Sequence, residues 1–522
     1  MHVPLTPVRA LYRAVDLFGK KVGVVCGERR FTYTEFGERC EQLAFGLLDD
    51  GVVPGDRVAF LSFNTHQLLE GYYGAPLVRA IVMPLNVRLT AAELTCILQH
   101  AEPKIVIYES DFAPLVEALR GLCPGVSRWI EAGAPYEGLL SRGRIQRPDI
   151  FTFNENEIAE LFYTSGSTGT PKGVTLSHRT LYLHMLGVSA TFYNDESNVE
   201  LHTIPLFHAN GWGRPQSSTM LGIKQVMVRR FETTQVFRLI QEQRATDMCV
   251  VPTMANSLIN ATDRAEWDLS SLRRVMIGGA ASSPELVERV ERAFPGCECS
   301  SGYGLTETSP LITMAQSKAS MRLPDAERRE RQARAGWAVV GASIRVVDMD
   351  MRDVPRDGQA IGEVITLSDH VMDGYFREPE ATRAVMSGPW LHTGDMGVWD
   401  EDGYIRIVDR KKQIIISGGE NISSIEVEAA IFAHPSVLEC AVVAAPDEKW
   451  GEVPAAIIVL KPDESLTTED LLAFLQQRLG KFKLPRIVEF SVEPLPKTGT
   501  GKIRKQNLRE RFWTGKEKRV QG

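Results

Sequence analysis

The sequence predicts an α/β protein in which a large N-terminal part is followed by a small α+β C-terminal domain. Helical periodicity alternates repeatedly with short apolar strands, and this rhythm changes after the basic triplet 410–412. The chain has 522 residues, of which 43% are hydrophobic. One core seldom serves so long a chain, so we expect about two to four packed units.

The N-terminal half predicts parallel sheets covered by helices. A helical stretch begins after Thr34 and ends at Gly51, and the apolar strand 56–64 follows it. Helix-like and strand-like segments alternate again at 91–110 and at 237–294, which favours two layered α/β subdomains. The first helix should bury one face, formed by Phe36, Cys40, Leu43, Leu47 and Leu48.

The sequence pattern changes near Gly336. Short strands separated by Gly and Asp turns, at 343–350, 362–368 and 403–409, predict a β-barrel-like subdomain. We therefore divide the chain into an N-terminal domain (1–409), a hinge (410–412) and a small mobile C-terminal domain (413–522). The C-terminal domain should contain a capped helix at 467–480 whose inward face is formed by Leu471, Leu472, Leu475 and Leu479.

Composition excludes several classes of protein. The net charge is -7, and 59 basic residues are scattered among 66 acidic ones, so nucleic acid is not an expected partner. The first 21 residues lack a secretion signal, and no window of about 18 apolar residues predicts a membrane span. None of the 8 cysteines forms a CxxC pair, as expected for reduced thiols in a cytoplasmic enzyme.

The loop Thr164–Gly173 is rich in glycine and hydroxyl side chains. Glycines let backbone N–H groups approach phosphate oxygens, and Lys172 adds a positive charge. A Walker A loop requires its lysine after the last glycine, whereas Lys172 precedes Gly173. Composition alone therefore leaves two interpretations open, a phosphate clamp of another kind and an ordinary surface turn.

The full string YTSGSTGTPKGV, Tyr163 to Val174, resembles the signature loop of the adenylate-forming superfamily. That superfamily includes acyl-CoA synthetases, firefly-type luciferases and the adenylation domains of peptide synthetases. Further motifs follow in family order over nearly the whole chain, and they are most similar to medium- and long-chain fatty acyl-CoA synthetases. The resemblance implies that ATP phosphates are held by Lys172 and by Thr164, Ser165, Gly166, Ser167, Thr168 and Gly169.

Two further motifs complete the nucleotide site that the resemblance implies. GYGLTETSP, Gly302 to Pro310, is similar to the adenine and magnesium motif, which assigns Thr306 to the α-phosphate and Glu307, with Thr164, to Mg²⁺. Mg²⁺ prefers hard oxygen ligands shared with nucleotide phosphates. WLHTGDMG resembles the element whose aspartate, here Asp395, accepts the ribose hydroxyls. The remaining nucleotide contacts are Gly279, Ser301, Gly302, Tyr303, Gly304 and Arg410.

The segments PLFHANGW and MIGGAA resemble the acyl pocket. The residues implied are uncharged apart from a histidine, which favours a mostly apolar monocarboxylic acid. Trp212 is compatible with a movable gate to a long tunnel and with the fixed floor of a short pocket. His208 is expected to shape the pocket and not to act as a base. The pocket residues are His208, Asn210, Trp212, Ala280 and Ala281.

The C-terminal motifs imply a second half-reaction with coenzyme A. PKTGTGKIRK is similar to the motif that carries the adenylation lysine, here Lys502. Lys412 takes the hinge position, and Gly418 and Gly419 let the backbone approach the pantetheine arm. The neighbouring cations of the terminal motif are expected to be surface charges: Lys497, Arg504 and Lys505.

Other functions remain open at this point. The chain fits an adenylating enzyme that loads a carrier protein or stops at the adenylate, and also a CoA ligase for an aryl or sulfur-containing short acid. A regulatory protein with a decayed site is disfavoured by the intact motif residues. A hydrolase of the amidase type is disfavoured because the chain has no GxSxG elbow. The family leads us to expect a homodimer.

Overall fold

The first large sheet has seven strands in the order β18-β8-β7-β4-β3-β5-β6. In the computed structural model, which describes residues 3–164, 171–318, 320–418, 420–497 and 503–514, strands β3 to β7 run parallel, whereas β8 and β18 are antiparallel additions. Successive side chains of a strand point to opposite faces, so Val58 and Phe60 of β3 belong to one hydrophobic core and Ala59 and Leu61 to another. The strands are β3 (Arg57–Leu61), β4 (Ile81–Pro84), β5 (Ile105–Tyr108), β6 (Arg128–Glu131), β7 (Ile158–Thr164), β8 (Lys172–Ser177) and β18 (Gly374–Tyr375).

The second large sheet has nine strands in the order β15-β14-β13-β12-β11-β9-β10-β1-β2. Its central strands are parallel, and antiparallel strands close both edges. The strands are β1 (Val22–Cys26), β2 (Arg29–Thr32), β9 (Val199–His202), β10 (Lys224–Met227), β11 (Asp247–Val250), β12 (Arg274–Ile277), β13 (Glu298–Gly304), β14 (Leu311–Met314) and β15 (Trp337–Ala338).

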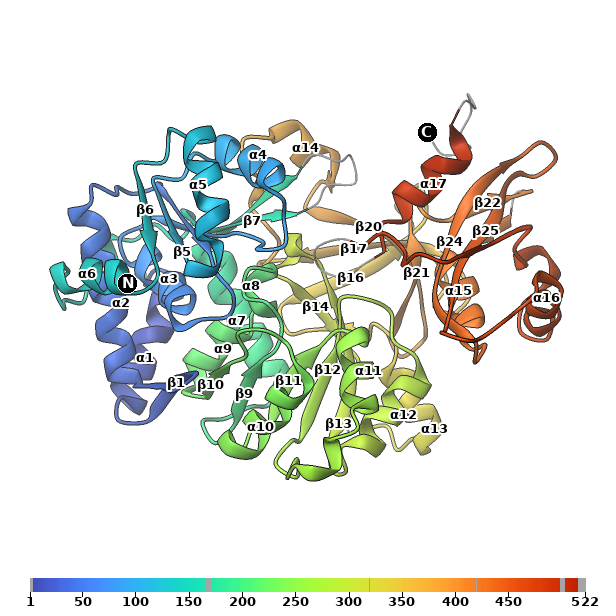
Figure 1. The fold of residues 1–522 in the computed structure, drawn as a ribbon, viewed down its shortest axis with the longest axis horizontal. Helices are drawn as coiled ribbons and strands as arrows, with labels where there is room; N and C mark the ends of the chain where they lie inside the picture. Colours follow the sequence, from blue (N-terminus) through green and yellow to red (C-terminus); the bar gives the residue numbers. More distant parts are fainter. Residues whose placement is uncertain (1–2, 165–170, 319, 419, 498–502, 515–522) are drawn as a thin grey trace. The chain divides into compact units, whose positions relative to one another are not determined.

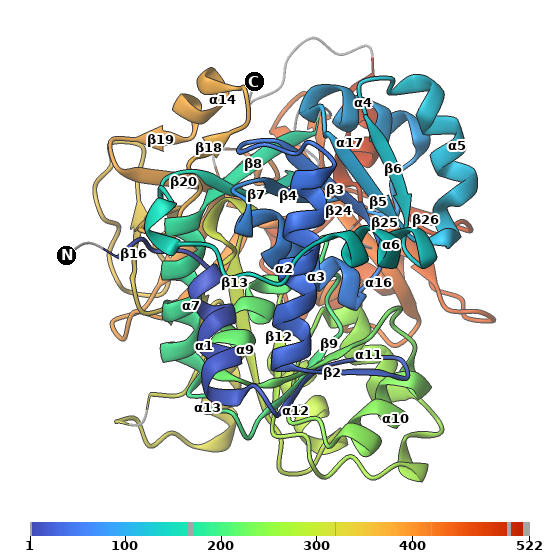
Figure 2. The same cartoon turned by 90° about the vertical axis from the view of Figure 1, so that its left-hand side faces the viewer.

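Helices fill the space between these two sheets and cover their outer faces. One core joins α1, α2 and α3 to residues of both sheets, and Figure 2 shows α2 and α3 between them. A second core packs α4 and α5 on the outer face of the seven-stranded sheet, and a third packs α10 to α12 on the nine-stranded one. The predicted pair of layered α/β subdomains is therefore present (Figure 1).

The helices of these layers have the following bounds: α1 (Val8–Phe18), α2 (Tyr33–Asp49), α3 (His66–Leu77), α4 (Ala91–Ala101), α5 (Ala113–Leu122), α6 (Ala134–Arg142), α7 (His178–Phe192), α8 (Ala209–Trp212), α9 (Arg214–Leu221), α10 (Thr233–Gln243), α11 (Pro252–Asn260), α12 (Pro284–Ala293), α13 (Asp325–Gln332) and α14 (Pro379–Ala384). Short 3₁₀ turns are η1 (Ser110–Phe112), η2 (Ile150–Thr152), η3 (Arg264–Glu266) and η4 (Thr306–Thr308).

Helix α2 corrects two details of the sequence prediction. The helix begins at Tyr33 because Thr32, and not Thr34, caps it: the Thr32 hydroxyl accepts from the Glu35 amide, and the Glu35 carboxylate accepts from the Thr32 amide. Four of the five predicted inward residues are buried, but Leu48 is 38% exposed. Leu48 lies beyond the edge of the apolar stripe that its neighbour Leu47 occupies.

A five-stranded sheet follows the two large layers in the chain, as the short strands predict. Its order is β16-β17-β20-β19, with β21 paired to β20. The strands are β16 (Ala342–Val347), β17 (Gly362–Ser368), β19 (Met386–Ser387), β20 (Trp390–Trp399) and β21 (Ile405–Arg410).

The C-terminal segment folds as the predicted small α+β domain. Its sheet has the order β23-β22-β25-β24, with β26 parallel to β25. One face packs against α15 and α16, where Leu471 and Leu475 are buried, and the other packs against α17. The elements are β22 (Ile415–Ser417), β23 (Glu420–Ile422), α15 (Ser424–Phe432), β24 (Val437–Asp447), β25 (Gly451–Leu460), α16 (Thr468–Gln476), η5 (Lys481–Lys483), β26 (Ile487–Ser491) and α17 (Lys505–Trp513).

By packing, the chain divides into two compact units. One comprises residues 1–344 and 366–391, and the other comprises 345–365 and 392–522. The mixed α/β class with a large N-terminal and a small C-terminal domain is confirmed. The division at 410–412 concerns which parts move together, so it stays a prediction. No helix in the described ranges is long and apolar enough to cross a bilayer.

Candidate active site

The hairpin of β7 and β8 carries the glycine-rich loop. Thr164 ends β7 and pairs with Lys172, the first residue of β8, so the loop begins and ends at adjacent backbone positions. Five residues that are predicted to contact phosphate lie outside the described residues: Ser165, Gly166, Ser167, Thr168 and Gly169. Thr164 and Lys172 remain as the described ends of the predicted phosphate clamp.

Lys172 and Glu307 are brought together by a residue that the sequence analysis missed. Tyr375, on β18, donates a hydrogen bond from its hydroxyl to Glu307 Oε1 at 2.9 Å. The Lys172 ammonium lies 4.9 Å from the centroid of the Tyr375 ring, within cation–π range. Burial and the neighbouring Glu307 carboxylate raise the pKa of Tyr375, so its hydroxyl stays a donor. No local sequence pattern identifies Tyr375, because its partner is 68 residues away.

The backbone also fixes Glu307 against this edge of the sheet. The Met372 amide donates to the Glu307 carbonyl at 2.8 Å, and the Phe376 amide donates to Gly173 at 2.7 Å. Glu307 lies in the turn η4, next to Thr306. These contacts place the predicted magnesium ligand beside the strand that follows the phosphate loop.

The donor set near Glu307 fits a Mg²⁺ ion shared with a nucleotide. Among the described residues, no three Asp, Glu, His or Cys side chains converge as a metal cage. Mg²⁺ needs no such cage, because it commonly takes one or two protein oxygens and completes its octahedron with phosphates and water. Glu307 would provide the carboxylate oxygen, and Thr164 a hydroxyl.

The adenine motif forms the end of β13, and its backbone packs so closely that residue 304 must be glycine. A Cβ on Gly304 would lie 1.7 Å from the Pro310 carbonyl oxygen, and a Cβ on Gly302 would lie 2.8 Å from the Met276 sulfur. Tyr303 stands between these glycines, half-buried, and Ser301 precedes them in the buried part of the strand. The motif therefore presents one aromatic side chain on a closely packed backbone.

Two buried histidines that the sequence analysis missed lie behind this motif. The Leu311 amide donates to His184 Nε2 at 3.2 Å, and His370 Nδ1 lies 3.3 Å from the Thr308 carbonyl oxygen. Burial lowers the pKa of His370 to about 4 and keeps the pKa of His184 well below its ordinary value. Both rings are therefore neutral, and His370 donates to Thr308.

The predicted acyl residues lie around a strained segment before α9, Ala209 to Gly213, which includes α8 and is named the Trp212 loop. Residues Ala209 to Gly213 all have positive φ, between 44° and 72°, which non-glycine residues rarely adopt. Trp212 is 7% exposed, and its ring lies against β12's end: a Cβ on Gly278 would be 3.0 Å from the indole. Gly279 and the following Ala280 and Ala281 are exposed, and His208, just before α8, is half-buried.

Asn210 has a structural contact in addition to its predicted position in the acyl pocket. Its amide donates to Glu160 at 3.1 Å, while its oxygen accepts from the Gly213 amide at 2.6 Å. Gln216 donates to the other Glu160 oxygen at 2.6 Å. Burial raises the pKa of Glu160 to about 8, because two neutral amides offset little of the desolvation cost. Glu160 lies on β7, so it links the phosphate hairpin to the Trp212 loop.

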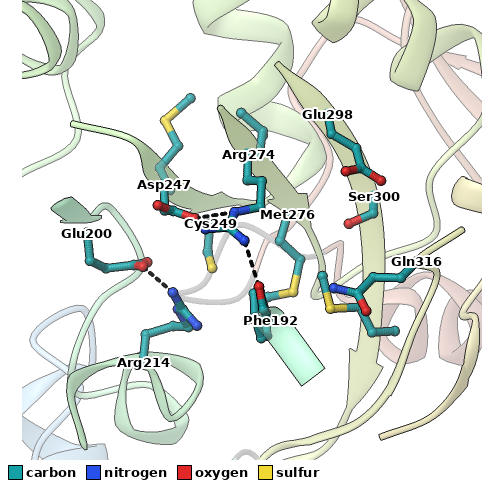
Figure 3. A pocket seen from close by; sticks show the side chains of 13 residues that line it. Phe192, Glu200, Arg214, Asp247, Cys249, Arg274, Met276, Glu298, Ser300 and Gln316 are labelled. Carbon is teal, nitrogen blue, oxygen red and sulfur yellow. Dashed lines mark hydrogen bonds and ion pairs between the residues drawn. The ribbon is translucent and has the colours of Figure 1, made fainter. Parts of the chain in front are cut away.

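A small cavity near the same loop is lined by one buried ion pair and by a second pair whose arginine is 26% exposed (Figure 3). Arg214 pairs with Glu200, and Arg274 Nε lies 2.6 Å from Asp247 Oδ1. Arg274 also donates to the Phe192 carbonyl at 2.6 Å. The cavity measures about 20 Å³, which is room for about one water molecule.

In the second unit, the structure brings two predicted nucleotide contacts together. Asp395 and Arg410 are direct partners across β20 and β21, and Arg410 Nε lies 2.6 Å from Asp395 Oδ1. Asp395 is buried, so the guanidinium holds its carboxylate in one orientation. The neighbouring Lys411, whose side chain is 55% exposed, pairs with Glu363 at 2.9 Å.

The remaining C-terminal predictions have different outcomes. Gly418 has φ +60°, and a Cβ there would lie 2.6 Å from the Trp450 ring, so glycine is required. Lys412 is exposed at the start of the turn after β21. Gly419 and Lys502 lie outside the described residues.

Lys505 corrects the expectation of a surface charge. Its ammonium contacts Glu428 and the Ser424 hydroxyl, both at 2.7 Å, and its side chain is 13% exposed. Asp409, for which the sequence predicted no role, is fully buried, and its carboxylate accepts a hydrogen bond from the Ser424 amide at 2.6 Å. Both residues anchor the N-terminus of α15, whose exposed backbone donors attract a carboxylate.

Comparison with known proteins identifies the family. The model of the AMP-binding enzyme matches residues 11–376, and that of the AMP-binding enzyme C-terminal domain matches 426–502. A long-chain-fatty-acid–CoA ligase of Thermus thermophilus is 38% identical, over 96% of this chain and 94% of its own. A peroxisomal butyrate–CoA ligase of Arabidopsis thaliana is 35% identical, over 98% and 93%. The cytoplasmic location of this chain therefore stays a prediction.

Among solved structures, an anthranilate CoA ligase in complex with anthranoyl-AMP matches with a TM-score of 0.88 and 26% identity over 98% of both chains. The sequence motifs, the sheet order and these matches agree over nearly the full length. The chain therefore belongs to the family of AMP-binding, adenylate-forming enzymes, in its acyl-CoA synthetase branch.

Proposed function

We propose that this acyl-CoA synthetase activates a mostly apolar monocarboxylic acid. In the first step, a carboxylate oxygen attacks the α-phosphorus of ATP, a new P–O bond forms, and pyrophosphate leaves. In the second step, the thiol of coenzyme A loses its proton and attacks the acyl carbonyl, and AMP leaves. The first step needs no general base, because the carboxylate is already ionised; it needs alignment and neutralised charge.

The observation that carries this proposal is the cluster of Lys172, Tyr375 and Glu307 at the phosphate hairpin. Lys172 supplies a cation at the end of the loop, and Tyr375 orients the Glu307 carboxylate. A bound Mg²⁺ would neutralise phosphate charge and withdraw electrons from phosphorus. Thr306, beside Glu307 in η4, is our candidate for the α-phosphate contact.

The second unit supplies the other proposed contacts. Asp395, held by Arg410, presents a carboxylate suited to two ribose hydroxyls. We assign Lys502 to the developing charge between carboxylate and α-phosphate, where electrostatic stabilisation counts most. The C-terminal domain then turns about Lys412, so that the Gly418 backbone approaches the pantetheine arm for thioester formation.

An apolar acid is favoured by the surroundings of Trp212. The buried, uncharged cluster of hydrophobic side chains that contains Trp212 also includes Val188, Phe192, Ile204, Ala209, Cys249, Met276, Leu311, Met314 and Val339. The cations in the wall of the adjoining cavity, Arg214 and Arg274, are already paired with Glu200 and Asp247, so a second carboxylate on the substrate would have to compete for them. The relatives are named for fatty, butyric and anthranilic acids, so the family alone leaves chain length and aryl character open.

An acid panel tests the function. Purified protein with ATP, Mg²⁺ and straight-chain, branched or aryl acids should release pyrophosphate only when an accepted acid is present. Adding coenzyme A should convert the adenylate to a CoA ester, which mass spectrometry identifies. If holo carrier protein replaces coenzyme A with a higher kcat/KM, the carrier-loading alternative holds. If no acid supports pyrophosphate release, the proposal fails.

A further inference from the structure

We propose that the acyl pocket is closed behind Trp212, so that this enzyme accepts short and aryl acids and excludes long straight chains. This inference rests on the proposed function, because it concerns the acid-binding end of the same site. It decides between the two roles of Trp212 that the sequence leaves open, a movable gate and a fixed floor.

The backbone on both sides of Trp212 is held in place. Asn210 joins Glu160 to the Gly213 amide across the tryptophan, with distances of 3.1 and 2.6 Å. Gly213 lies so close to the His184 ring that an added Cβ would be 2.2 Å away. Five consecutive positive φ values are strained and persist only where surrounding contacts hold them, so the contacts of Asn210 and Gly213 that hold this loop also oppose a movement of Trp212.

The indole also has little room to swing aside. One of its edges lies against Gly278 and Gly279, at the end of β12. The indole also belongs to the uncharged cluster, whose members include Met276 and Leu311. Protein interiors have few voids larger than a water molecule, and overpacking such a cluster is destabilising.

Charged side chains lie beyond that cluster. Phe192, Cys249, Met276 and Met314 belong both to the cluster and to the wall of the small cavity in Figure 3. The rest of that wall includes both members of the pairs Glu200–Arg214 and Asp247–Arg274.

The first of these pairs closes the space most firmly. Arg214 and Glu200 have side-chain exposures of 3% and 2%, and the Arg214 guanidinium lies 4.2 Å from the centroid of the Phe192 ring. An acyl chain that passed Trp212 would have to separate this buried pair, and leaving a buried charge without its partner is strongly unfavourable. The cavity itself accepts about one water molecule and no run of methylenes.

The wild-type enzyme provides the first test, with no variant needed. The kcat/KM for acid-dependent pyrophosphate release is measured for saturated straight-chain acids of 2 to 16 carbons and for benzoate. We expect the highest values at about four to six carbons or with benzoate, and a loss of at least about 100-fold by 12 carbons. Values at 12 or 16 carbons equal to those of butyrate would overturn the inference while leaving the ligase function intact. Absence of turnover with every acid would instead remove the proposed function, and the inference with it.

Variants then test whether Trp212 forms the closed end of the acyl pocket. Trp212→Ala should move the optimum to longer acids by about two methylene groups, because only the volume of the indole is gained. The control Trp267→Ala removes a half-buried tryptophan that packs on the core under α10, and it should keep the wild-type profile. If the single variant Trp212→Ala has the same kcat/KM for the 16-carbon acid as for butyrate, the ion pairs do not close the pocket.

A triple variant tests the ion pair directly. Adding Glu200→Leu and Arg214→Leu to Trp212→Ala should extend the accepted range further, to about 10 carbons, since buried pairs can often be replaced by apolar residues. The matched control places Arg238→Leu and Glu242→Leu in the Trp212→Ala background, because that pair is exposed on α10. An unchanged profile in a folded triple variant would contradict the role of the pair, and the wild-type profile decides the inference if the triple variant does not fold.

Discussion

Tyr375 is the residue whose role in the candidate site is most specific. Its hydroxyl contacts Glu307 and its ring faces Lys172, so it orients two predicted site residues without being predicted itself. Tyr375→Phe should leave the fold intact and lower adenylation kcat/KM at limiting Mg²⁺ by about 10-fold or more, as loss of a residue that orients a metal ligand commonly does. Saturating Mg²⁺ should recover part of that loss.

The control for this experiment is Tyr193→Phe, since Tyr193 is 81% exposed. A Mg²⁺ titration of pyrophosphate release separates the two variants. Identical titration curves for wild type and Tyr375→Phe would show that the hydrogen bond does not orient the carboxylate.

Glu160 makes stability depend on pH in an unusual direction. Its folded pKa is about 8, above its ordinary value of 4.5. Between these values the folded chain holds a proton that the unfolded chain has lost, so unfolding free energy falls as pH rises and levels off above about pH 8. Glu160→Gln removes this titration. The Gln216 oxygen, which has no partner among the described residues, is available to accept from the new amide.

We therefore expect the melting temperature of Glu160→Gln, relative to wild type, to rise between pH 6 and pH 9. The change corresponds to roughly 1–3 kcal/mol. Glu117→Gln, at a position 72% exposed, is the control and should follow wild type. If the melting temperatures of wild type and Glu160→Gln change with pH in the same way between pH 6 and pH 9, the raised pKa of Glu160 is contradicted.

The residue scale also shows where sequence reasoning ends. Glu307 and Asp395 were identified because each lies in a contiguous motif. Tyr375, Glu160 and His370 act through partners that are distant in sequence, and a single tyrosine, glutamate or histidine has no local signature. Lys505 was misjudged for the same reason: the carboxylate that pairs with it, Glu428, lies on another helix.

At the scale of elements, periodicity predicted most of the fold. Strands such as β3 and β5 are continuous apolar runs because both of their faces are buried, and the helices between them have one apolar face. Element boundaries were less predictable, because two threonines near the start of α2 both suit an N-cap. Only the geometry of the reciprocal bonds between Thr32 and Glu35 distinguishes them.

Helix α2 allows this difference to be tested. Thr32→Ala removes the cap and should cost about 1 kcal/mol, which lowers the melting temperature. Thr34→Ala is the matched control, because Thr34 is exposed in the first turn and alanine favours the helix. The capping assignment is wrong if the Thr34→Ala protein melts at the lower temperature of the two in calorimetry.

At the scale of the whole molecule, the proposed contacts are divided between the two compact units. The phosphate hairpin, Glu307 and the Trp212 loop belong to one compact unit, whereas the Asp395–Arg410 pair and the Gly418 turn belong to the other. Sequence order placed the Gly418 turn in the C-terminal domain but Asp395 in the N-terminal domain (1–409), whereas by packing both belong to the second unit. It did not predict how the second unit is formed from residues 345–365 and 392–522, which requires knowing which strands pair.

This division leads to a prediction about the half-reactions. Lys502 contributes only to adenylation if the C-terminal domain turns about Lys412 between the steps, because its charge then leaves the site before the thiol attacks. Lys502→Ala should lower acid-dependent pyrophosphate release by at least about 100-fold, yet convert a supplied acyl adenylate and coenzyme A to the thioester at a rate within a few-fold of wild type.

Lys497→Ala is the matched control for that variant. Lys497 belongs to the same motif but is 40% exposed and paired with Glu439, so its removal should change neither half-reaction appreciably. Single-turnover assays of each step, with the adenylate supplied chemically for the second, measure both rates independently. Equal loss of both steps in Lys502→Ala would mean that one arrangement of the two units serves both reactions, and the rotation about Lys412 would have to be abandoned.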